Sequence, residues 1–406
     1  MGRFTIIIVV GFTILMGILK LTQGRLIGRG QELTADRFTE VVARNVTTSA
    51  VNVCLYELGQ NYDWRGGYDE LEIMGGTVDA VIEDSSDDAS IEAGQVRITA
   101  TSEYLGESAS AVILMRKTPY SEFAYFTDIE PVIYFITGDT LRGPIHTNGQ
   151  FHIMGNPVFF GLVSSVASTW AGWGSPKFKA GTYFGCPSIN LPTSLTNLEA
   201  AAQSGGIRFA GETNLQFMSN GTFNWEVFHY SGSPAVKVVD STGNTALSSI
   251  NGVIATDNAK DLHIKGTISG KATVMSEGNL WIDDDVLYLH DPLTDPNASD
   301  MLGLISQQNV IVTDNTANRT NCTIHASIMA LNTSFKVQNY NTGSPRGTLT
   351  VLGGIVQDLR GAVGTMSGGV IVTGYLKKYI YDQRMLTKAP PFYPVFSRNS
   401  IVSWYE

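Results

Sequence analysis

Short apolar runs separated by glycines constrain the fold of this chain more than any other feature. Thr137–Val163 contains several such runs, punctuated by Gly138, Gly143, Gly149, Gly155 and Gly161. Each run has the length of a short strand, and each glycine marks a tight turn. The same punctuation returns between Ser249 and Leu289. The two segments together predict one β architecture made of stacked short strands.

Composition excludes several classes of function. The 406 residues include 42 glycines and only 16% charged residues, and the formal net charge is -10. Nucleic-acid binding requires a basic face, which this chain lacks. The sequence contains neither a P-loop nor a GxGxxG motif, so we expect no nucleotide and no cofactor. The three cysteines, Cys54, Cys186 and Cys322, form no CxxC pair and are interpreted as buried thiols.

The first apolar segment, Phe4–Leu19, has no charged residue and is flanked by Arg3 and Lys20. As a helix it spans roughly 24 Å, and flanking cations complete a thin bilayer crossing. We predict a retained transmembrane anchor over residues 1–24 whose partner is the lipid bilayer. The alternative is a cleaved signal peptide, which would leave a secreted soluble protein.

Helical periodicity continues beyond the anchor. From Leu33 one apolar stripe recurs at spacings of three and four residues, with a C-cap candidate at Gly59. The pattern then changes to three strand-like segments beginning at Leu71, Gly94 and Ser108. Residues 25–117 are therefore predicted to form an amphipathic helix and a small antiparallel sheet. The predicted apolar stripe consists of Phe38, Val42, Val46, Ala50 and Val53.

This N-terminal arrangement resembles a type IV pilin or a minor-pilin-like protein. The sequence FTIII beginning at Phe4 is similar to the start of a mature pilin, and the helix again continues into an amphipathic half that packs on a sheet. Arg3 stands between Gly2 and Phe4, and Ile8 occupies the fifth position from Phe4. The resemblance implies assembly or display at the cell envelope.

A second resemblance covers the chain from Thr118 onward. The blocks GPIHTNG, RGAVGT and TGYLKKYIYDQRM look like those of a bacterial envelope family that carries a domain of unknown function behind a pilin-like N-terminus. The resemblance implies a β-helix-like body in a surface or pilus-associated protein. It implies no activity.

The residue pattern of the body predicts the same architecture. A right-handed β-helix, or β-solenoid, buries one apolar position of every two along each rung. We assign residues 118–389 to this domain, with a helix and hairpin excursion at about 187–248 and an extended tail at 390–406. The overall fold class is α+β, mainly β. The expected inward positions are Leu262, Ile264, Ile268, Val274, Leu280 and Ile282.

Aspartates form the densest acidic group in the body. On a strand, Asp283 and Asp285 share a face and Asp284 takes the other. Paired carboxylates suit calcium binding or acid–base catalysis. Structural or turn roles are the ordinary interpretation, so we assign no catalytic and no metal residues. The neighbouring polar residues that complete the group are His290, Asp291, Asp295, Asn297 and Asp300.

His146, Asn148 and His152 form the other polar set in the body. A turn at Gly149 separates the two histidines and argues against a metal pair, so hydrogen bonding that organises a turn is expected.

Together these patterns predict a non-enzymatic structural protein of the bacterial cell envelope, pilus-related or displayed as a scaffold or adhesin. Charges beside the anchor favour the reverse orientation, but the glycine- and asparagine-rich β body is typical of an exported domain. We therefore expect a single-pass protein whose body is periplasmic or at the surface. Its partners would be envelope or pilus assembly proteins, or other copies of the chain. The alternative is a β-helix enzyme that acts on polysaccharide through the clustered aspartates.

Overall fold

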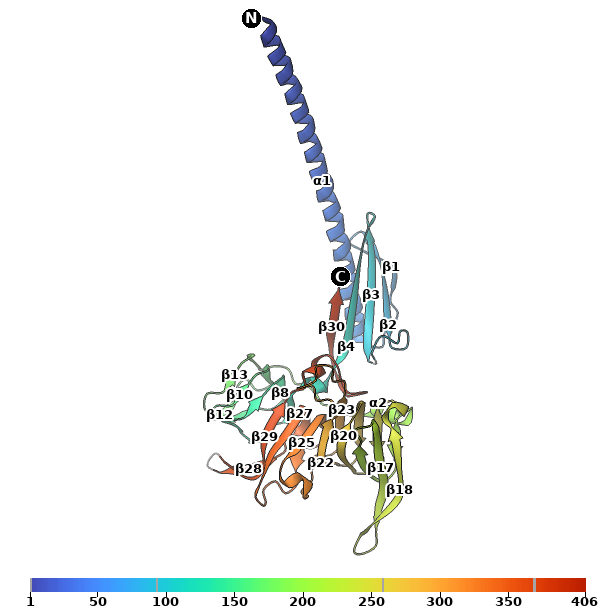
Figure 1. Cartoon of the computed structure of the whole chain (residues 1–406), viewed down its shortest axis with the longest axis vertical. Coiled ribbons are helices and arrows are strands. Elements are labelled where there is room, and N and C mark those ends of the chain that lie inside the picture. The colour runs from blue at the N-terminus through green and yellow to red at the C-terminus, as the bar shows by residue number, and fades with distance from the viewer. Residues whose placement is uncertain (1, 93, 258, 368–369) are drawn as a thin grey trace. The chain divides into compact units, whose positions relative to one another are not determined.

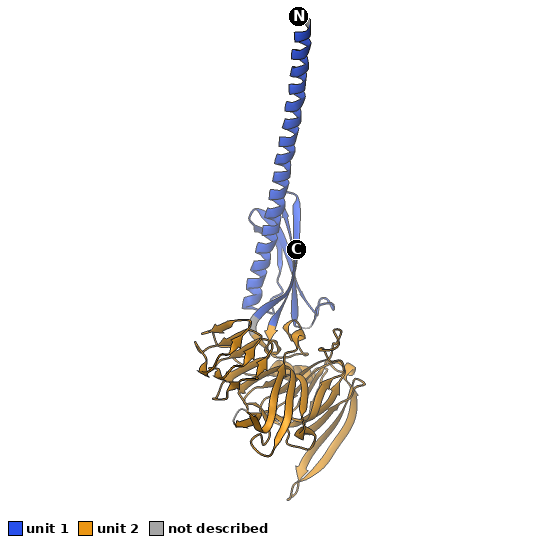
Figure 2. Ribbon diagram, turned by 60° about the vertical axis from the view of Figure 1, so that its left-hand side comes forward, with its two compact units in different colours: residues 1–117, 398–406 blue, residues 118–397 orange. Residues whose placement is uncertain are grey.

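A computed structural model describes residues 2–92, 94–257, 259–367 and 370–406. The chain divides into two compact units, and each is described by itself. Unit 1 comprises residues 1–117 and 398–406, and unit 2 comprises residues 118–397 (Figure 2).

Unit 1 is built from one long helix and a five-stranded sheet. The helix, α1, runs from Gly2 to Gln60. The pairs β1–β2, β2–β3 and β3–β4 are antiparallel. In sheet order the strands are β1 (Tyr68–Ile73), β2 (Gly76–Asp84), β3 (Gln95–Tyr104), β4 (Glu107–Pro119) and β30 (Val395–Tyr405).

Two tight turns set the register of this sheet. Met74 and Gly75 both have positive φ, as do Leu105 and Gly106. Positive φ at both central residues is the geometry of a type I′ hairpin, which matches the twist of antiparallel strands. The segment from Leu71 was predicted to be one strand, but the first turn divides it into β1 and β2.

The C-terminal segment corrects one sequence prediction. Residues 390–406 were expected to form an extended tail, but Val395–Tyr405 is strand β30 and extends the sheet of unit 1 beyond β4. The physical reason is that β4 would otherwise leave an unpaired edge, and a strand from the far end of the chain supplies the missing hydrogen bonds.

The core of unit 1 lies between the second half of α1 and one face of the sheet. Strand residues alternate between this core and the surface, as in Val78, Ala80 and Ile82 of β2. Phe38, predicted to belong to the apolar stripe, is 62% exposed, because the buried face of α1 begins near Ala43. The helix residues buried in this core are Val46, Ala50, Val51, Cys54 and Leu58.

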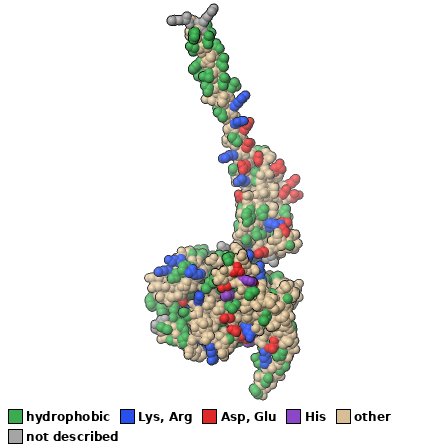
Figure 3. Space-filling model, viewed as in Figure 1, with side chains coloured by type: hydrophobic (Ala, Val, Ile, Leu, Met, Phe, Trp, Pro, Cys, Tyr) green, Lys and Arg blue, Asp and Glu red, His purple; other side chains and the backbone are tan. Residues whose placement is uncertain are grey.

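Among the described residues, α1 is the one helix long and apolar enough to cross a membrane. The side chains along Phe4–Leu19 are exposed, whereas those of Val46 and Ala50 are buried. Hydrophobic side chains surround the first part of the helix, and charged ones follow farther along (Figure 3). One continuous helix thus carries an uncovered apolar half and a packed half.

Unit 2 consists mainly of parallel strands in which elements two apart along the chain pair with each other. One such series is β19 (Val253–Thr256), β21 (Lys271–Ser276), β23 (Met301–Ser306), β25 (Cys322–Ala330) and β27 (Pro345–Leu359). A second series is β20 (Leu262–Ile268), β22 (Leu280–Tyr288), β24 (Val310–Val312) and β26 (Phe335–Val337). The chain therefore alternates between two parallel series as it advances.

The two glycine-punctuated segments belong to one pairing network, but not in chain order. β27 pairs with β5 (Tyr125–Ile129), which continues in parallel to β8 (Ile145–Thr147), β11 (Val163–Ser165) and β14 (Thr182–Phe184). Strands near both ends of unit 2 therefore lie side by side. No sheet closes on itself among the described strands, and the right-handed β-helix stays a prediction.

The remaining short strands of the first segment continue the network. β29 (Val370–Ile380) pairs with β7 (Thr140–Leu141), which leads to β10 (Val158–Phe159) and β13 (Lys177–Phe178). β28 (Gly364–Ser367) pairs antiparallel with β29. A separate sheet contains β6 (Phe135–Ile136), β9 (His152–Met154) and β12 (Ala171–Trp173).

The excursion predicted at about 187–248 is smaller than expected. The predicted helix is present as α2 (Thr196–Gln203). However, β15 (Ile207–Phe209) and β16 (Glu212–Phe217) pair in parallel with β19 and β20, because their buried Phe209 and Leu215 extend the same core. Only β17 (Thr222–Ser231) and β18 (Val236–Ala246) leave the parallel pattern, as an antiparallel hairpin (Figure 1).

The main core of unit 2 follows the predicted alternation. All six residues expected to point inward between Leu262 and Ile282 are fully buried in one cluster, which confirms that part of the prediction.

Candidate functional site

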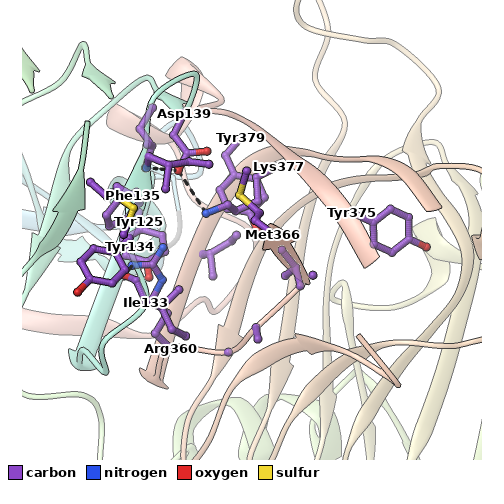
Figure 4. Close-up of a pocket in the computed structure, with 18 of the residues that line it drawn as sticks. Tyr125, Ile133, Tyr134, Phe135, Asp139, Arg360, Met366, Tyr375, Lys377 and Tyr379 are labelled. Atoms are coloured by element: carbon purple, nitrogen blue, oxygen red, sulfur yellow. Dashed lines mark hydrogen bonds and ion pairs between the residues drawn. The ribbon is translucent and has the colours of Figure 1, made fainter. Parts of the chain in front are cut away.

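A cavity of about 710 Å³ lies within unit 2, where the two ends of this unit meet. One wall comes from β5, β6 and β7 and the loops between them, and the other from β27, β28 and β29. Figure 4 shows residues of both walls pointing into the space between them. Cavities of this size are typical of small-molecule sites.

Aromatic rings form much of the cavity wall. Tyr125 and Phe135 are buried and meet edge to face, with ring centroids 5.6 Å apart. Trp173 is 64% exposed, so one lining ring reaches solvent. The other aromatic residues of the lining are Tyr134, Phe335, Tyr375 and Tyr379, and its aliphatic residues include Ile133, Ile136, Leu141, Met154, Ile355, Val363, Met366 and Ile371.

Arg360 is held rigidly at the cavity wall. Its Nη1 donates to Oε1 of Glu130 at 2.5 Å and to the carbonyl of Ile133 at 2.8 Å. Its guanidinium carbon lies 4.0 Å from the ring centroid of Phe135, within the range of a cation–π contact. The side chains of Arg360 and Glu130 are 4% and 0% exposed, so this is a buried, compensated ion pair.

Lys377 supplies the second cation. Its Nζ lies 3.4 Å from Oδ2 of Asp139, which also accepts the backbone N–H of Ile136 at 3.0 Å. Figure 4 shows Asp139 and Lys377 facing each other across the two walls. Burial lowers the pKa of Lys377, and Asp139 opposes that shift.

The hydroxyl of Tyr125 is buried, and the side chain of Gln357 is its hydrogen-bond partner. Burial raises the pKa of Tyr125 well above its usual value, so the phenol stays neutral. The cavity thus combines aromatic walls with two compensated cations.

This cavity could not be predicted from the sequence, because its polar residues lie far apart in the chain. Glu130 and Arg360 are 230 positions apart, and Asp139 and Lys377 are 238 apart. One signal was present: Arg360 begins the block RGAVGT, and Lys377 lies in TGYLKKYIYDQRM. Two of the three quoted blocks of the second resemblance therefore line the same cavity.

The His146 and Asn148 set organises a different part of unit 2. Nε2 of His146 lies 2.9 Å from Oδ1 of Asn148, and its Nδ1 lies 2.9 Å from Oγ of Ser164. Asn148 also exchanges two hydrogen bonds with the backbone of Ile189. His152 instead contacts the ring of Tyr134 edge to face. The two histidines thus contact different groups.

Asp283 and Asp285 form hydrogen bonds along one corner of the parallel series. Oδ2 of Asp283 lies 2.9 Å from Nδ1 of His263, and Thr313 donates to Oδ1 at 2.6 Å. Burial raises the pKa of Asp283, but hydrogen bonds from His263 and Thr313 outweigh it and leave the pKa lowered. Asp285 instead accepts the backbone N–H of Thr323 at 2.7 Å.

The two carboxylates predicted to share a face therefore bind different partners. The reason is that residues 280–282 pair with β24 whereas Val286 pairs with β25, which places Asp283–Asp285 at the change of partner. Asp291 and Asp295 accept backbone N–H groups two residues ahead, as turn residues do. Among the described residues, no group of three or more His, Cys, Asp or Glu is placed to hold a metal ion.

The buried His146 predicts a pH dependence of stability. Burial lowers the pKa of His146 below its usual 6.5. On acidification the unfolded chain therefore binds a proton that the folded chain excludes, and the free energy of unfolding falls as the pH drops below about 6.5. We expect His146→Gln to reduce this fall, measured by denaturant unfolding at about pH 7 and about pH 5. His229→Gln at an exposed site is the control, and identical pH slopes for all three proteins would contradict the expectation.

Comparison with known proteins shows similarity to one protein family and to solved structures. Residues 91–182 match the model of a family described as a domain of unknown function, DUF4900. No curated protein matches the chain. Among solved structures, the chain is similar to the competence-associated pilin ComZ from Thermus thermophilus, with 11% sequence identity and a TM-score of 0.36. That alignment covers 90% of this chain and 97% of the pilin.

Proposed function

We propose that this chain is a non-enzymatic structural protein of the bacterial cell envelope, anchored in the membrane by a pilin-like N-terminal module. One observation carries the proposal. The apolar side chains of Phe4–Leu19 are uncovered on the same continuous helix whose second half packs on the sheet of unit 1. An uncovered apolar helix of this length requires a bilayer or the apolar helices of neighbouring subunits.

The mechanism would be assembly or display. The first half of α1 would lie in the membrane or pack in a pilus-like filament, as the resemblance to type IV pilins implies. The exported body, with its parallel β series, would present a scaffolding or adhesive surface. The hydrogen bonds of Asp283 and Asp285 support a structural role for the aspartates, so the polysaccharide-active alternative gains no support.

The N-terminal residue and the fractionation of the native protein test this proposal. Intact mass would be measured on the membrane fraction and on material sheared from the cell surface. Cleavage beside Gly2 or Arg3, with recovery in sheared filaments, would establish a pilin-like subunit. A full-length chain retained in the membrane would establish an anchored scaffold instead. A soluble chain lacking about its first twenty residues would refute both forms of the proposal.

A further inference from the structure

We propose that the outward face of four neighbouring strands in unit 2 binds a linear acidic polysaccharide. The strands are β29, β7, β10 and β13, which pair in that order. The inference names a partner for the body of the protein, and it rests on the proposed function only for the exposure of that body at the cell envelope. The cations that carry the proposal, called the basic face below, are Arg142, Lys177, Lys179 and Lys378.

Strand register places these cations on one face. Leu141 and Phe159 pair in register and are buried in the main core. Phe178 and Tyr379 pack against the same core. Because successive side chains of a strand point to opposite sides, the residues next to these four point outward. Those neighbours include all four cations of the basic face, and each of them is exposed.

The figures locate the basic face on unit 2. Figure 3 shows Lys and Arg side chains gathered where Figure 1, in the same view, labels β10 and β13. The parallel ladder continues to Lys179, whose backbone N–H donates to the carbonyl of Phe159 at 2.8 Å. The sequence shows no such cluster of cations, because the pairing of β29 with β7 joins opposite ends of unit 2.

No carboxylate neutralises the basic face among the described residues, and its four cations form no ion pair there. The four strands contain no Asp or Glu. Between residues 131 and 198 the one acidic residue is Asp139, whose side chain is 6% exposed and pairs with Lys377. The basic face is therefore a local concentration of positive charge on a chain of net charge -10, and it favours an anionic partner.

The exposure of the cations favours a polymer over a small anion. A single ion pair at an exposed position adds little to affinity. A ligand that carries many anionic groups gains from several such pairs at once. Neighbouring strands lie about 4.8 Å apart, so the four strands offer a row of roughly 14 Å along which a linear chain can contact successive cations.

The side chains between the cations suit sugar rings. Thr140, Val158 and Phe160 also point outward from β7 and β10. The C–H face of a pyranose ring can contact Val158 and Phe160, while its hydroxyls reach Thr140. The guanidinium carbon of Arg142 lies 4.2 Å from the ring centroid of Phe160. Because Arg142 covers this ring, Phe160 is not free to enter a bilayer as an interfacial anchor would.

Charge density argues against a nucleic acid. Duplex DNA carries one phosphate per about 1.7 Å of its axis, whereas the basic face supplies only four cations. Phosphates beyond the basic face would approach a chain whose net charge is -10. A polysaccharide with one carboxylate per sugar has a lower charge density, so its repulsion by the rest of the chain is weaker.

Fluorescence anisotropy tests the proposal with the full chain in nanodiscs of phosphatidylcholine, and empty nanodiscs are the reference. The probe is a labelled oligogalacturonate long enough to span the four strands. We expect the probe to bind, and we expect added salt to weaken binding because exposed ion pairs are screened. Neither the galacturonate monomer nor neutral dextran should displace the probe.

Two double variants locate the binding. Lys177→Gln combined with Lys179→Gln should lower probe affinity roughly tenfold, as expected for the loss of two exposed ion pairs. The matched control combines Lys271→Gln with Lys388→Gln. It removes the same charge from two exposed lysines outside the four strands, so probe affinity should fall by less than about twofold.

Other outcomes would overturn the inference. Equal losses in the two double variants would refute a localised basic face, and displacement by dextran would refute the need for anionic groups. If oligothymidylate or phosphatidylglycerol vesicles displaced the probe at a lower concentration of charge than unlabelled oligogalacturonate, the partner would be a nucleic acid or a membrane instead. Absence of binding would refute the inference alone, because the anchoring of the chain is tested separately by fractionation.

Discussion

Replacing Arg360 with methionine is expected to lower the free energy of unfolding of unit 2 by about 3–5 kcal/mol. The substitution keeps an apolar side chain against Phe135 but removes the counter-charge of Glu130, whose side chain is fully buried. Among the described residues, the other hydrogen bond to this carboxylate comes from the Thr127 hydroxyl, a much weaker compensation than a guanidinium. Denaturant unfolding followed by circular dichroism would measure the effect, with the transition of unit 2 fitted separately from that of unit 1.

Two further variants test whether the loss of stability arises from the burial of the Glu130 carboxylate. Arg319→Met breaks an ion pair with Asp314 whose arginine is 65% exposed, so it should cost less than about 1 kcal/mol. Adding Glu130→Gln to Arg360→Met removes the uncompensated charge and should restore part of the lost stability. If Arg360→Met and Arg319→Met lowered the free energy of unfolding equally, the Glu130 carboxylate would have to be exposed to solvent. That result would contradict the burial seen in the structure.

Local features of the fold could be predicted from the sequence because they depend on neighbouring residues. Alternation with period two identified the buried positions Leu262, Ile264 and Ile282, and glycines marked the turns between strands. The stripe on α1 was predicted correctly at Val46 and Ala50, which lie in the core, but Val53 is outside that core and Phe38 is exposed. Periodicity shows which face is apolar, but it does not show how far a partner extends along it.

Pairing between distant segments could not be predicted. Ile355 pairs with Tyr125, and β30 joins a sheet whose other strands lie near the N-terminus. Such pairings are decided by which edges remain open once local elements have formed, and a single sequence does not record that choice. The predictions of an extended tail at 390–406 and of an excursion at about 187–248 were wrong for this reason.

The candidate site depends on the same long-range pairing. The aspartates from Asp283 to Asp295 were considered as site residues because they are dense in the sequence. In the structure they accept hydrogen bonds at a corner of the parallel strands and in a loop. Arg360 and Lys377 lie more than 200 positions from Glu130 and Asp139, and the four residues come together only because β27 and β29 pair with β5 and β7. The density of charged residues in the sequence was therefore a poor guide to this cavity.

The strongest effect on localisation is expected from charges in the first half of α1. Replacing both Ile8 and Phe12 with aspartate should release the protein from membranes, because each carboxylate at the centre of a membrane helix costs about 2.5–3.5 kcal/mol. Both side chains are more than half exposed, so the substitutions remove no contact within the described structure. Alkaline carbonate extraction would measure the change: the natural chain is expected in the membrane pellet, and the double variant in the supernatant.

The control places a single aspartate farther along the same helix. Leu33→Asp changes a side chain as exposed as Ile8 but lies beyond the apolar segment Phe4–Leu19, so the protein should stay in the pellet. Circular dichroism of all variants should show the same folded sheet in unit 1, because its core begins at Ala43. A double variant that still sediments with membranes would mean that another surface of the chain holds it there. In that case Phe4–Leu19 would be needed for contacts between subunits rather than for anchoring.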